Sequence, residues 1–372
     1  MKRPGQRTGS EAQRQASRPR EHRARGSRDD SRMLPRPDQY AAMLDGAAAQ
    51  RYAFPAINVT SSQTLNAAMR GFADAGSDGI VQITVGGARY LSGAANDALL
   101  GARAFAALGR ELAPRYPVAV ALHTDHCPPS DADAFLWPLL ADSADRIERR
   151  EPPLFHSHMF DGSTLPLEKN LRVSAALLDR CRELDVVLEI ECGVVGGEED
   201  GIGTEGVSNE RLYTTPEDLV RVAAAMGTGS RGRYLLAATF GNVHGVYAPG
   251  HVQLRPQILA EGQEALAKAY EGARFQYVFH GSSGSSPADL RAAVDNGVVK
   301  VNLDTEAQYA FTRAAAAHMV ENREGVLADE PALGDKRAYD PRAWGAKAES
   351  AMAQRVARAC EELGSAGHSI VS

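Results

Sequence analysis

The chain has 372 residues, of which 44% are hydrophobic and 24% charged, a balance that excludes a disordered, fibrous or disulfide-stapled protein. No stretch reaches the roughly 18 consecutive apolar residues of a membrane helix, and the start of the sequence lacks the apolar region of a secretory signal. Four scattered cysteines without a CxxC pair indicate neither a disulfide framework nor a structural zinc site. We therefore expect a globular, cytoplasmic protein with reduced thiols.

The net charge of -6 is unevenly distributed along the chain. Residues 1–32 hold ten Lys and Arg against four Asp and Glu, whereas residues 33–372 hold 31 basic against 43 acidic residues. Because the tail has almost no aliphatic side chains to bury, we predict that residues 1–33 are disordered, either as a solvated extension or because the true start is Met33. A nucleic-acid-binding arm is the alternative. The tail shows no stacking or base-reading chemistry, so we do not expect a nucleic acid partner.

From Tyr52 onward, short apolar runs bounded by Gly, Asn, Asp or Ser alternate with stretches of helical periodicity. There are eight such runs, at residues 52–59, 79–87, 118–126, 154–162, 186–193, 234–245, 275–285 and 298–305. Eight parallel strands with eight crossovers predict an α/β fold, a closed (β/α)8 TIM barrel, with an open doubly wound sheet as the competing architecture. We predict a single domain over residues 34–372.

Two segments are candidates for insertions in this barrel. The first is the Gly- and acid-rich segment 194–213, and the second is the C-terminal extension 321–372. The extension ends in a sequence, residues 343–363, whose Ala, Met, Val and Leu spacing predicts a helix packed against the barrel.

Three histidines lie at the carboxyl ends of predicted strands. His126 ends the third run, His244 closes the sixth, and His280 follows the apolar part of the seventh. In a barrel these ends converge on the face that carries active sites. Each histidine alone could be a hydrogen-bonded structural residue, but three together predict a transition-metal site with one coordination position left open.

Carboxylates follow the same distribution. Asp125 precedes His126, Asp161 ends the fourth run, and Glu191 shares one face of the fifth run with Glu189. Buried carboxylates are costly unless they are paired or metal-bound, so this cluster indicates a site that handles protons and cations. A structural ion-pair network is the alternative, and for Glu189 the two interpretations are evenly balanced. Glu199 lies on the glycine-flanked segment GGEEDG, which is either a mobile loop with a base or a solvated turn.

Glycine, serine and asparagine follow the last two predicted strands. GSSGSS begins at Gly281, and the eighth run ends in Asn302 to Thr305. Barrels commonly bind phosphate with the loops after strands seven and eight. A phosphate site is therefore expected beside the candidate ligand His280.

At this point the chain resembles the class II, metal-dependent fructose-1,6-bisphosphate aldolases. The resemblance covers residues 34–372 and rests on ordered motifs, namely FPAIN, ALHTDHC, SHMFDGS, LEIECGVVGGEEDG, LYTTPED, AATFGNVHGVY, VFHGSSGS, VVKVNLDT and YDPRAW. It implies a lyase of glycolysis and gluconeogenesis that interconverts fructose 1,6-bisphosphate with dihydroxyacetone phosphate and glyceraldehyde 3-phosphate. Departures from the family pattern are small: Ser282 stands where the family usually has glycine, and Thr64 where serine is common.

The resemblance also implies roles for individual residues. His126, His244 and His280 correspond to the ligands of a catalytic Zn²⁺, and Asp161 and Glu191 to a second divalent metal site; a monovalent cation is a further candidate ligand of the protein. Asp125 corresponds to the acid/base at oxygen and Glu199 to the carboxylate that moves a proton at carbon. The substrate-binding set is Asn58, Thr64, Gly245, Gly281, Ser282, Ser283, Asn302, Asp304, Thr305 and Arg342, the last reaching from a neighbouring subunit of a homodimer or homotetramer.

Three other functions stay open at this level. A sister enzyme acting on tagatose 1,6-bisphosphate or a related ketose phosphate would differ in one hydroxyl group of the substrate. A Schiff-base aldolase would need a desolvated lysine in the barrel, for which Lys300 is the candidate, but the histidine cluster would then have no role. A catalytically idle scaffold with an RNA-binding tail conflicts with the intact set of His126, His244, His280 and Asp125.

Overall fold

The computed structural model describes residues 34–193, 196–199, 202–203, 213–244, 254–329 and 333–371, with only the backbone given for 196–199, 202–203 and 243–244. The basic tail, predicted to be disordered over residues 1–33, lies outside the described residues. The domain boundaries therefore stay a prediction.

Eight parallel strands close into a barrel in the order β1-β11-β10-β8-β5-β4-β3-β2. Their bounds are β1 Phe54–Asn58, β2 Gly79–Thr84, β3 Val120–Cys127, β4 Ser157–Phe160, β5 Val187–Cys192, β8 Tyr234–Ala238, β10 Tyr277–Phe279 and β11 Val298–Leu303. Each strand falls within or overlaps one of the eight predicted runs. The (β/α)8 barrel is confirmed, and the open sheet is wrong because β1 pairs with both β2 and β11.

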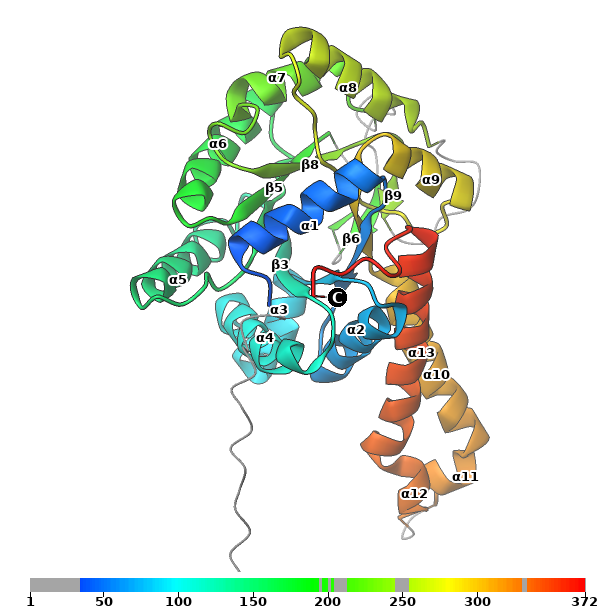
Figure 1. Ribbon diagram of the computed structural model, residues 1–372. Coiled ribbons are helices and arrows are strands. Elements are labelled where there is room, and N and C mark those ends of the chain that lie inside the picture. Colours follow the sequence, from blue (N-terminus) through cyan, green and yellow to red (C-terminus); the bar gives the residue numbers. More distant parts are fainter. Residues whose placement is uncertain are drawn as a thin grey trace, which may run out of the picture. The chain divides into compact units, whose positions relative to one another are not determined.

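Helices alternate with these strands along the chain (Figure 1). They are α1 Pro37–Gln50, α2 Ser62–Ala75, α3 Val85–Leu91, α4 Ala98–Leu112, α5 Leu136–Glu148, α6 Leu167–Glu183, α7 Pro216–Met226, α8 Gln257–Ala269, α9 Pro287–Asp295, α10 Thr305–Glu321, α11 Arg323–Val326, α12 Lys336–Tyr339 and α13 Pro341–Glu362, with 3₁₀ turns at Gly93–Ala95 and Ala113–Arg115. Local sequence sets several starts. For example, Ser286 accepts a hydrogen bond from the Asp289 amide and Pro287 occupies the first turn of α9.

Helix α1 closes the amino-terminal end of the barrel, and Figure 1 shows it lying across the strands. Its buried residues Tyr40, Met43, Leu44 and Ala47 join a core cluster with inward residues of the strands such as Phe54. This cluster is almost entirely apolar. The amino-terminal half of the barrel interior is therefore a hydrophobic plug, which leaves polar chemistry to the other half.

Polar residues occupy the carboxyl half of the interior in pairs two positions apart. β3 contributes His123 and Asp125, β5 Glu189 and Glu191, and β11 Lys300 and Asn302; all six are buried. Residues two apart on a strand face the same side, so each pair points into the barrel. The interior thus has a deeper layer of His123, Glu189 and Lys300 below an outer layer at the mouth.

Two predicted strands are longer than the observed ones. The run 79–87 ends as strand at Thr84, where the Thr84 hydroxyl accepts a hydrogen bond from the Gly87 amide and begins α3. The run 234–245 leaves the barrel after Ala238. Val243–His244 instead forms β9, which pairs with β6, Gly196–Glu199, in a small separate sheet that also contains β7, Ile202–Gly203. His244 therefore does not end a barrel strand, contrary to the prediction.

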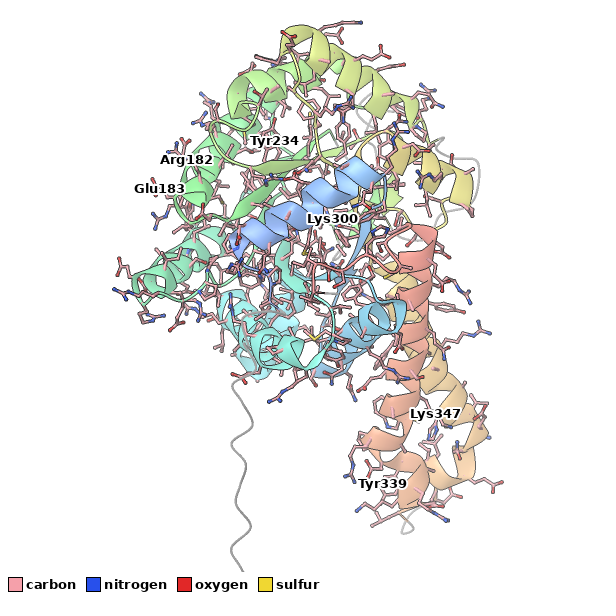
Figure 2. All side chains as sticks on the ribbon, in the orientation of Figure 1. Arg182, Glu183, Tyr234, Lys300, Tyr339 and Lys347 are labelled. Carbon is pink, nitrogen blue, oxygen red and sulfur yellow. The ribbon has the colours of Figure 1, made fainter. Side chains whose placement is uncertain are left out.

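The predicted C-terminal helix is confirmed as α13, which packs against α2 and α10. The ends of α10 and α13 remote from the barrel, together with α11 and α12, form an arm; Figure 2 labels Tyr339 and Lys347 on it. At the contact of α2 with α13, a Cβ atom on Gly71 would lie 2.5 Å from Val356 Cβ and 2.6 Å from the Ala353 carbonyl oxygen. Only glycine allows this close crossing. Among the described residues, no helix is both long and apolar enough to cross a membrane.

Gly71→Ala should lower the free energy of unfolding by about 1–3 kcal/mol, because the new methyl group meets backbone that cannot move aside. Urea titration of the purified protein measures this change. The matched control is Gly345→Ala in α13, whose added Cβ meets only Nε2 at the end of the flexible Gln63 side chain, 2.7 Å away. The control should be neutral or stabilising by up to about 1 kcal/mol through helix propensity. Equal stability of the two variants would contradict the close-crossing argument.

Candidate active site

The titratable residues at the carboxyl ends of the strands form two overlapping clusters. Asp125, His126 and His280 have ligand atoms within 4.8 Å of one another, and so do His126, Asp161 and Glu191. These residues come from β3, β5, the residue after β4 and the residue after β10. Five of the residues predicted from strand ends therefore meet at one mouth of the barrel.

A break in the β3 ladder brings Asp125 and His126 to the same site. Consecutive strand residues normally face opposite sides of a sheet. His126, however, has φ 34°, in the left-handed region, and the pairing of β3 with β4 shifts register between Thr124 and Cys127. Such an irregularity re-aims a side chain, and here it turns the His126 ring toward Asp161 and Glu191, whose carboxylate oxygens lie 3.1 Å and 3.9 Å from Nδ1.

His280 is fully buried between two carboxylates. Its Nε2 lies 2.8 Å from Glu189 Oε1 and its Nδ1 3.2 Å from Glu191 Oε2, and its ring centroid is 4.7 Å from that of His126. Burial alone would lower the pKa of His280, but the hydrogen bonds to both glutamates outweigh it and raise that pKa to about 9. Burial alone would raise the pKa of Asp161, but the hydrogen bond and charge of His126, with hydrogen bonds from Ser163, outweigh it and lower that pKa to about 2.

The donor set fits a divalent transition metal. Imidazole nitrogens and carboxylate oxygens are the ligands that Zn²⁺ accepts in proteins, and catalytic zinc sites use about three protein ligands. A metal taking one ring nitrogen of His280 must displace the proton there, so the glutamate that faces the other nitrogen would hold the remaining N–H and orient the ring.

Asp125 is held by three amide groups from three strands. Asn58 Nδ2 and Gln82 Nε2 both donate to Oδ2 at 2.9 Å, and Asn302 Nδ2 donates to Oδ1 at 3.2 Å. Gln82 Nε2 also donates to Asn58 Oδ1 at 2.6 Å. This fully buried carboxylate is thus fixed in orientation beside the histidine pair, a suitable arrangement for proton transfer.

The loop after β10 and the start of α10 meet at the same mouth. Gly281 has φ 62°, and the Ser282 hydroxyl donates to the Asn302 carbonyl oxygen at 2.8 Å. Ser283 is partly exposed on this loop. Asp304 precedes α10, which begins at Thr305, and the Gly284 amide of the loop donates to Glu306 in the first turn of this helix at 3.3 Å. The first amides of a helix have no partner within it and suit an anion. These predicted phosphate-binding residues are therefore neighbours.

The remaining predicted site residues are Thr64, Arg342 and three whose side chains the structure does not describe. The side chains of His244 and Glu199, and all of Gly245, lie outside the described residues. Thr64 lies near the mouth in the first turn of α2, but its hydroxyl is engaged in the helix cap, where it accepts from the Ser61 amide and donates to the Ser61 carbonyl oxygen. Arg342 lies at the arm end of α13, 87% exposed and 2.7 Å from Asp340.

Sequence reasoning missed Gln82 and undervalued two further residues. Gln82 is a lone polar residue in an otherwise apolar strand, which is a usable signal. His123 lies 3.5 Å from Glu189, and burial lowers its pKa to about 3, so it is a neutral imidazole. Lys300 is fully buried with Nζ 2.9 Å from Glu189, so the structural ion pair suspected at Glu189 is present, and Glu189 also contacts His280.

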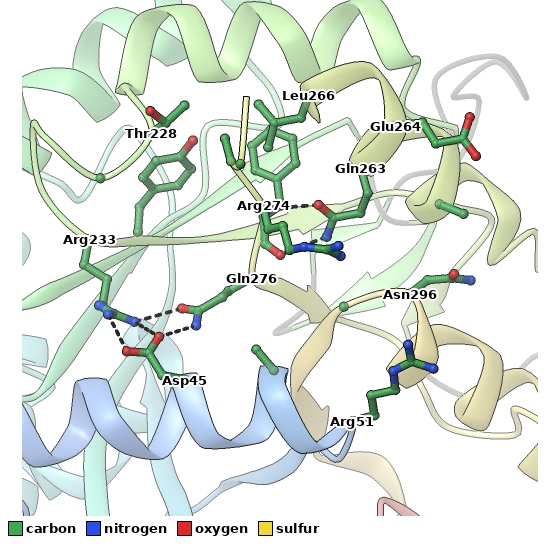
Figure 3. A pocket seen from close by; sticks show the side chains of 18 of the residues that line it. Asp45, Arg51, Thr228, Arg233, Gln263, Glu264, Leu266, Arg274, Gln276 and Asn296 are labelled. Carbon is green, nitrogen blue, oxygen red and sulfur yellow. Dashed lines mark hydrogen bonds and ion pairs between the residues drawn. The ribbon is translucent and has the colours of Figure 1, made fainter. Parts of the chain in front are cut away.

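A cavity of about 670 Å³ lies at the opposite end of the barrel, among α1, α8 and the segments that precede β8, β10 and β11 (Figure 3). Three of its polar groups bind one another: Arg233 donates to both Asp45 oxygens and to Gln276, and Gln276 donates to Asp45. The amino-terminal face of a barrel serves stability. We therefore assign the active site to the other mouth.

A barrel whose carboxyl-end mouth carries clustered metal-binding donors beside a fixed carboxylate, with a phosphate-type loop adjoining, is the architecture of a metal-dependent enzyme. The family model described as "Fructose-bisphosphate aldolase class-II" matches residues 38–368. The fructose-bisphosphate aldolase of Streptomyces galbus is 54% identical over 336 residues, which cover 90% of this chain and 98% of that protein. The Corynebacterium glutamicum protein of the same name is 50% identical over 336 residues, 89% of this chain and 97% of its own length.

The crystal structure of fructose-bisphosphate aldolase from Campylobacter jejuni superposes with a TM-score of 0.79 at 33% identity, covering 90% of this chain and 97% of that one. This chain belongs to the class II fructose-bisphosphate aldolase family, a family of metal-dependent carbon-carbon lyases. The resemblance drawn from the sequence motifs is thereby confirmed.

His126→Ala should abolish tight binding of a divalent metal, lowering it from about one ion per chain to near zero, because His126 is shared by both donor clusters. Elemental analysis of protein dialysed against Zn²⁺ measures this change, and circular dichroism checks that the barrel is intact. The control is His368→Gln at the amino-terminal end, where the ring stacks on Tyr52. Full metal content in His126→Ala would contradict the assignment.

Proposed function

We propose that this chain cleaves fructose 1,6-bisphosphate to dihydroxyacetone phosphate and glyceraldehyde 3-phosphate and catalyses the reverse condensation. The observation that carries the proposal is the meeting of Asp125, a fixed carboxylate, with His126 and His280 within 4.8 Å at the barrel mouth. Membership of the family indicates the class of reaction. The geometry supports it, because a carboxylate that could act as a base lies beside clustered metal-binding donors. Central sugar phosphate metabolism, and hence the cytoplasm, is the setting that we propose for it.

Zn²⁺ is the ion that we propose, with His126, His280 and His244 as ligands. When bound, it would supply Lewis acidity that stabilises negative charge on the ketose oxygens. Asp161 and Glu191, which share His126 in the second cluster, are the candidates for a second divalent site. A monovalent cation is a further proposed ligand, for which the described residues single out no position.

Asp125 is the proposed acid/base at oxygen. In cleavage it removes the proton of the C4 hydroxyl as the C3–C4 bond breaks and the aldehyde forms, and in condensation it returns that proton. Its three amide partners leave the carboxylate little freedom, which favours a productive approach to the substrate. Glu199 is the proposed group that moves the proton at carbon of the three-carbon fragment.

The loop after β10 and the start of α10 are proposed to hold the dihydroxyacetone phosphate part of the substrate. The amide groups of the loop and of the helix N-terminus suit a phosphate group. The residues are Gly245, Gly281, Ser282, Ser283, Asn302, Asp304 and Thr305, with Asn58 on the neighbouring strand β1 and Thr64 in the helix that follows it.

A fructose rather than a tagatose substrate is favoured because relatives at 50–54% identity carry the fructose name. A Schiff-base mechanism at Lys300 is disfavoured, because its Nζ is fully buried and committed to Glu189 and Asn302. Such a nitrogen has no path to a carbonyl carbon.

We propose that the chain works as a homo-oligomer in which the arm reaches a second copy. Apolar residues are exposed on it to an unusual degree, namely Val320 at 77%, Leu327 at 68% and Leu333 at 85%. Arg342, exposed on the same arm, would then bind the second phosphate in the site of the neighbouring subunit, since its planar guanidinium can donate two parallel hydrogen bonds.

A coupled assay with fructose 1,6-bisphosphate tests the proposed function directly. Turnover should disappear on treatment with a chelator, return on addition of Zn²⁺, and be insensitive to borohydride in the presence of substrate, because no imine forms. Full activity in the chelated protein, or no cleavage by the zinc-loaded protein, would refute the proposal.

Mixing two variants, each impaired at low substrate concentration, tests the shared site. Asp125→Asn should lose turnover and Arg342→Ala should mainly raise KM for the bisphosphate. After mixed refolding at low substrate concentration, activity should recover to about a quarter of the wild-type value, because half of the dimers are mixed and each has one complete site. Lack of recovery, with mixed dimers detected by mass spectrometry, would show that Arg342 does not serve the partner's site.

A further inference from the structure

A fully buried lysine, Lys300 of β11, lies in the interior of the barrel; Figure 2 labels it. Lys300 Nζ lies 2.9 Å from Glu189 Oε2 and 3.2 Å from Glu189 Oε1, and it donates to Asn302 Oδ1 at 2.7 Å. Burying an ammonium group is costly unless the surroundings compensate for the lost water. The contacts with Glu189 explain how the charge is tolerated but leave the short contact with Asn302 without a function.

The contact with Asn302 connects the buried cation to the proposed catalytic base. Asn302 uses both ends of its amide: Oδ1 accepts from Lys300, and Nδ2 donates to Asp125 Oδ1 at 3.2 Å. Lysine can only donate hydrogen bonds and an ionised carboxylate can only accept them. Only one of the two amide orientations of Asn302 therefore satisfies both neighbours.

We propose that Lys300 is a positioning residue for proton transfer by Asp125, and this inference rests on the proposed aldolase function. By holding the Asn302 oxygen, the ammonium group prevents the amide from turning its oxygen toward Asp125, where two acceptors would repel each other. Through Asn302, Lys300 thereby fixes the position of the Asp125 oxygen that faces this amide. Lys300 itself touches neither substrate nor metal ligand in this role.

The second oxygen of Asp125 is held independently. Asn58 and Gln82 donate to Oδ2 from β1 and β2, so loss of Lys300 would leave two of the three amide contacts in place. The carboxylate should then rotate or tilt rather than leave the site. A graded loss of turnover is expected, unlike the complete loss that follows removal of Asp125.

The discriminating variant is Lys300→Met, which keeps most of the volume and removes the donor. In the zinc-loaded protein, kcat for cleavage of fructose 1,6-bisphosphate should fall about 10–100-fold, the size of effect expected when a catalytic group is displaced by a fraction of an ångström to one ångström. Hydrogen exchange of saturating dihydroxyacetone phosphate in deuterated water does not use the C4 hydroxyl proton. The exchange rate should therefore stay within about 3-fold of the wild type, and zinc content should be unchanged.

The control removes a cation from an ion pair at the other end of the barrel. Arg233→Met breaks the pair with Asp45, 2.7 Å apart, and should leave both reactions unchanged. Equal loss of cleavage and exchange in Lys300→Met, loss of its zinc, or unchanged cleavage would each overturn the inference. A wild-type protein that fails to cleave the bisphosphate would instead refute the proposed function, so the two failures are distinguishable.

If Lys300→Met does not fold because Glu189 is left without its cation, the double variant Lys300→Met/Glu189→Gln keeps the core neutral. It still lacks the ammonium donor to Asn302, so the selective loss of cleavage should persist. A folded, zinc-loaded double variant with wild-type cleavage would overturn the role of Lys300.

Discussion

The closed parallel barrel can hold this site only because, in each layer of its interior, the charge of the buried carboxylates is balanced by positive charge. Asp125, Glu189 and Glu191 are all buried, and an unpaired buried carboxylate is so costly that it would take up a proton instead. In the deeper layer, Lys300 supplies the compensating cation and lowers the pKa of Glu189 against the effect of burial. In the outer layer, the negative charge of the carboxylates lies beside His126 and His280. A protonated imidazole, or the metal that replaces its proton, would balance that charge.

The hydrophobic plug formed with α1 fills the other half of the barrel interior. Tyr40 lies at the boundary, since its hydroxyl is 3.1 Å from the Ser157 hydroxyl, which in turn lies 2.8 Å from His123 Nδ1. This chain of hydrogen bonds ends the polar region on the side away from solvent. The charged side chains that β3, β5 and β11 direct into the barrel interior thus lie in its carboxyl half, where the field they produce acts on the mouth and its ligands.

Much of the fold could be predicted from the sequence because strand and helix periods differ and each run was bounded by turn residues. The site was harder. Strict alternation places Asp125 and His126 on opposite faces, and the register shift that unites them has no visible signal in HTDHC. The role of Lys300 was also hidden, because its partner Glu189 is 111 residues away and only barrel closure brings β5 and β11 to opposite sides of one interior. The position of Lys300 in a predicted strand marked it as unusual and suggested a nucleophile. In the structure its ammonium group is instead held in an ion pair.

The arm adds a constraint that a single barrel does not need. Gly71 lets α13 cross α2 closely, and this fixes the direction in which α13 carries Arg342 away from its own barrel mouth. There Arg342 is exposed and, among the described residues, pairs with Asp340, which also accepts a hydrogen bond from the Arg342 backbone amide at the start of the helix. An exposed pair of this kind contributes little to stability, so a doubly charged phosphate group can take the guanidinium from Asp340 at small cost. The weak pair with Asp340 therefore suits the proposed role of Arg342, in which the guanidinium of one subunit binds a phosphate group in the site of another.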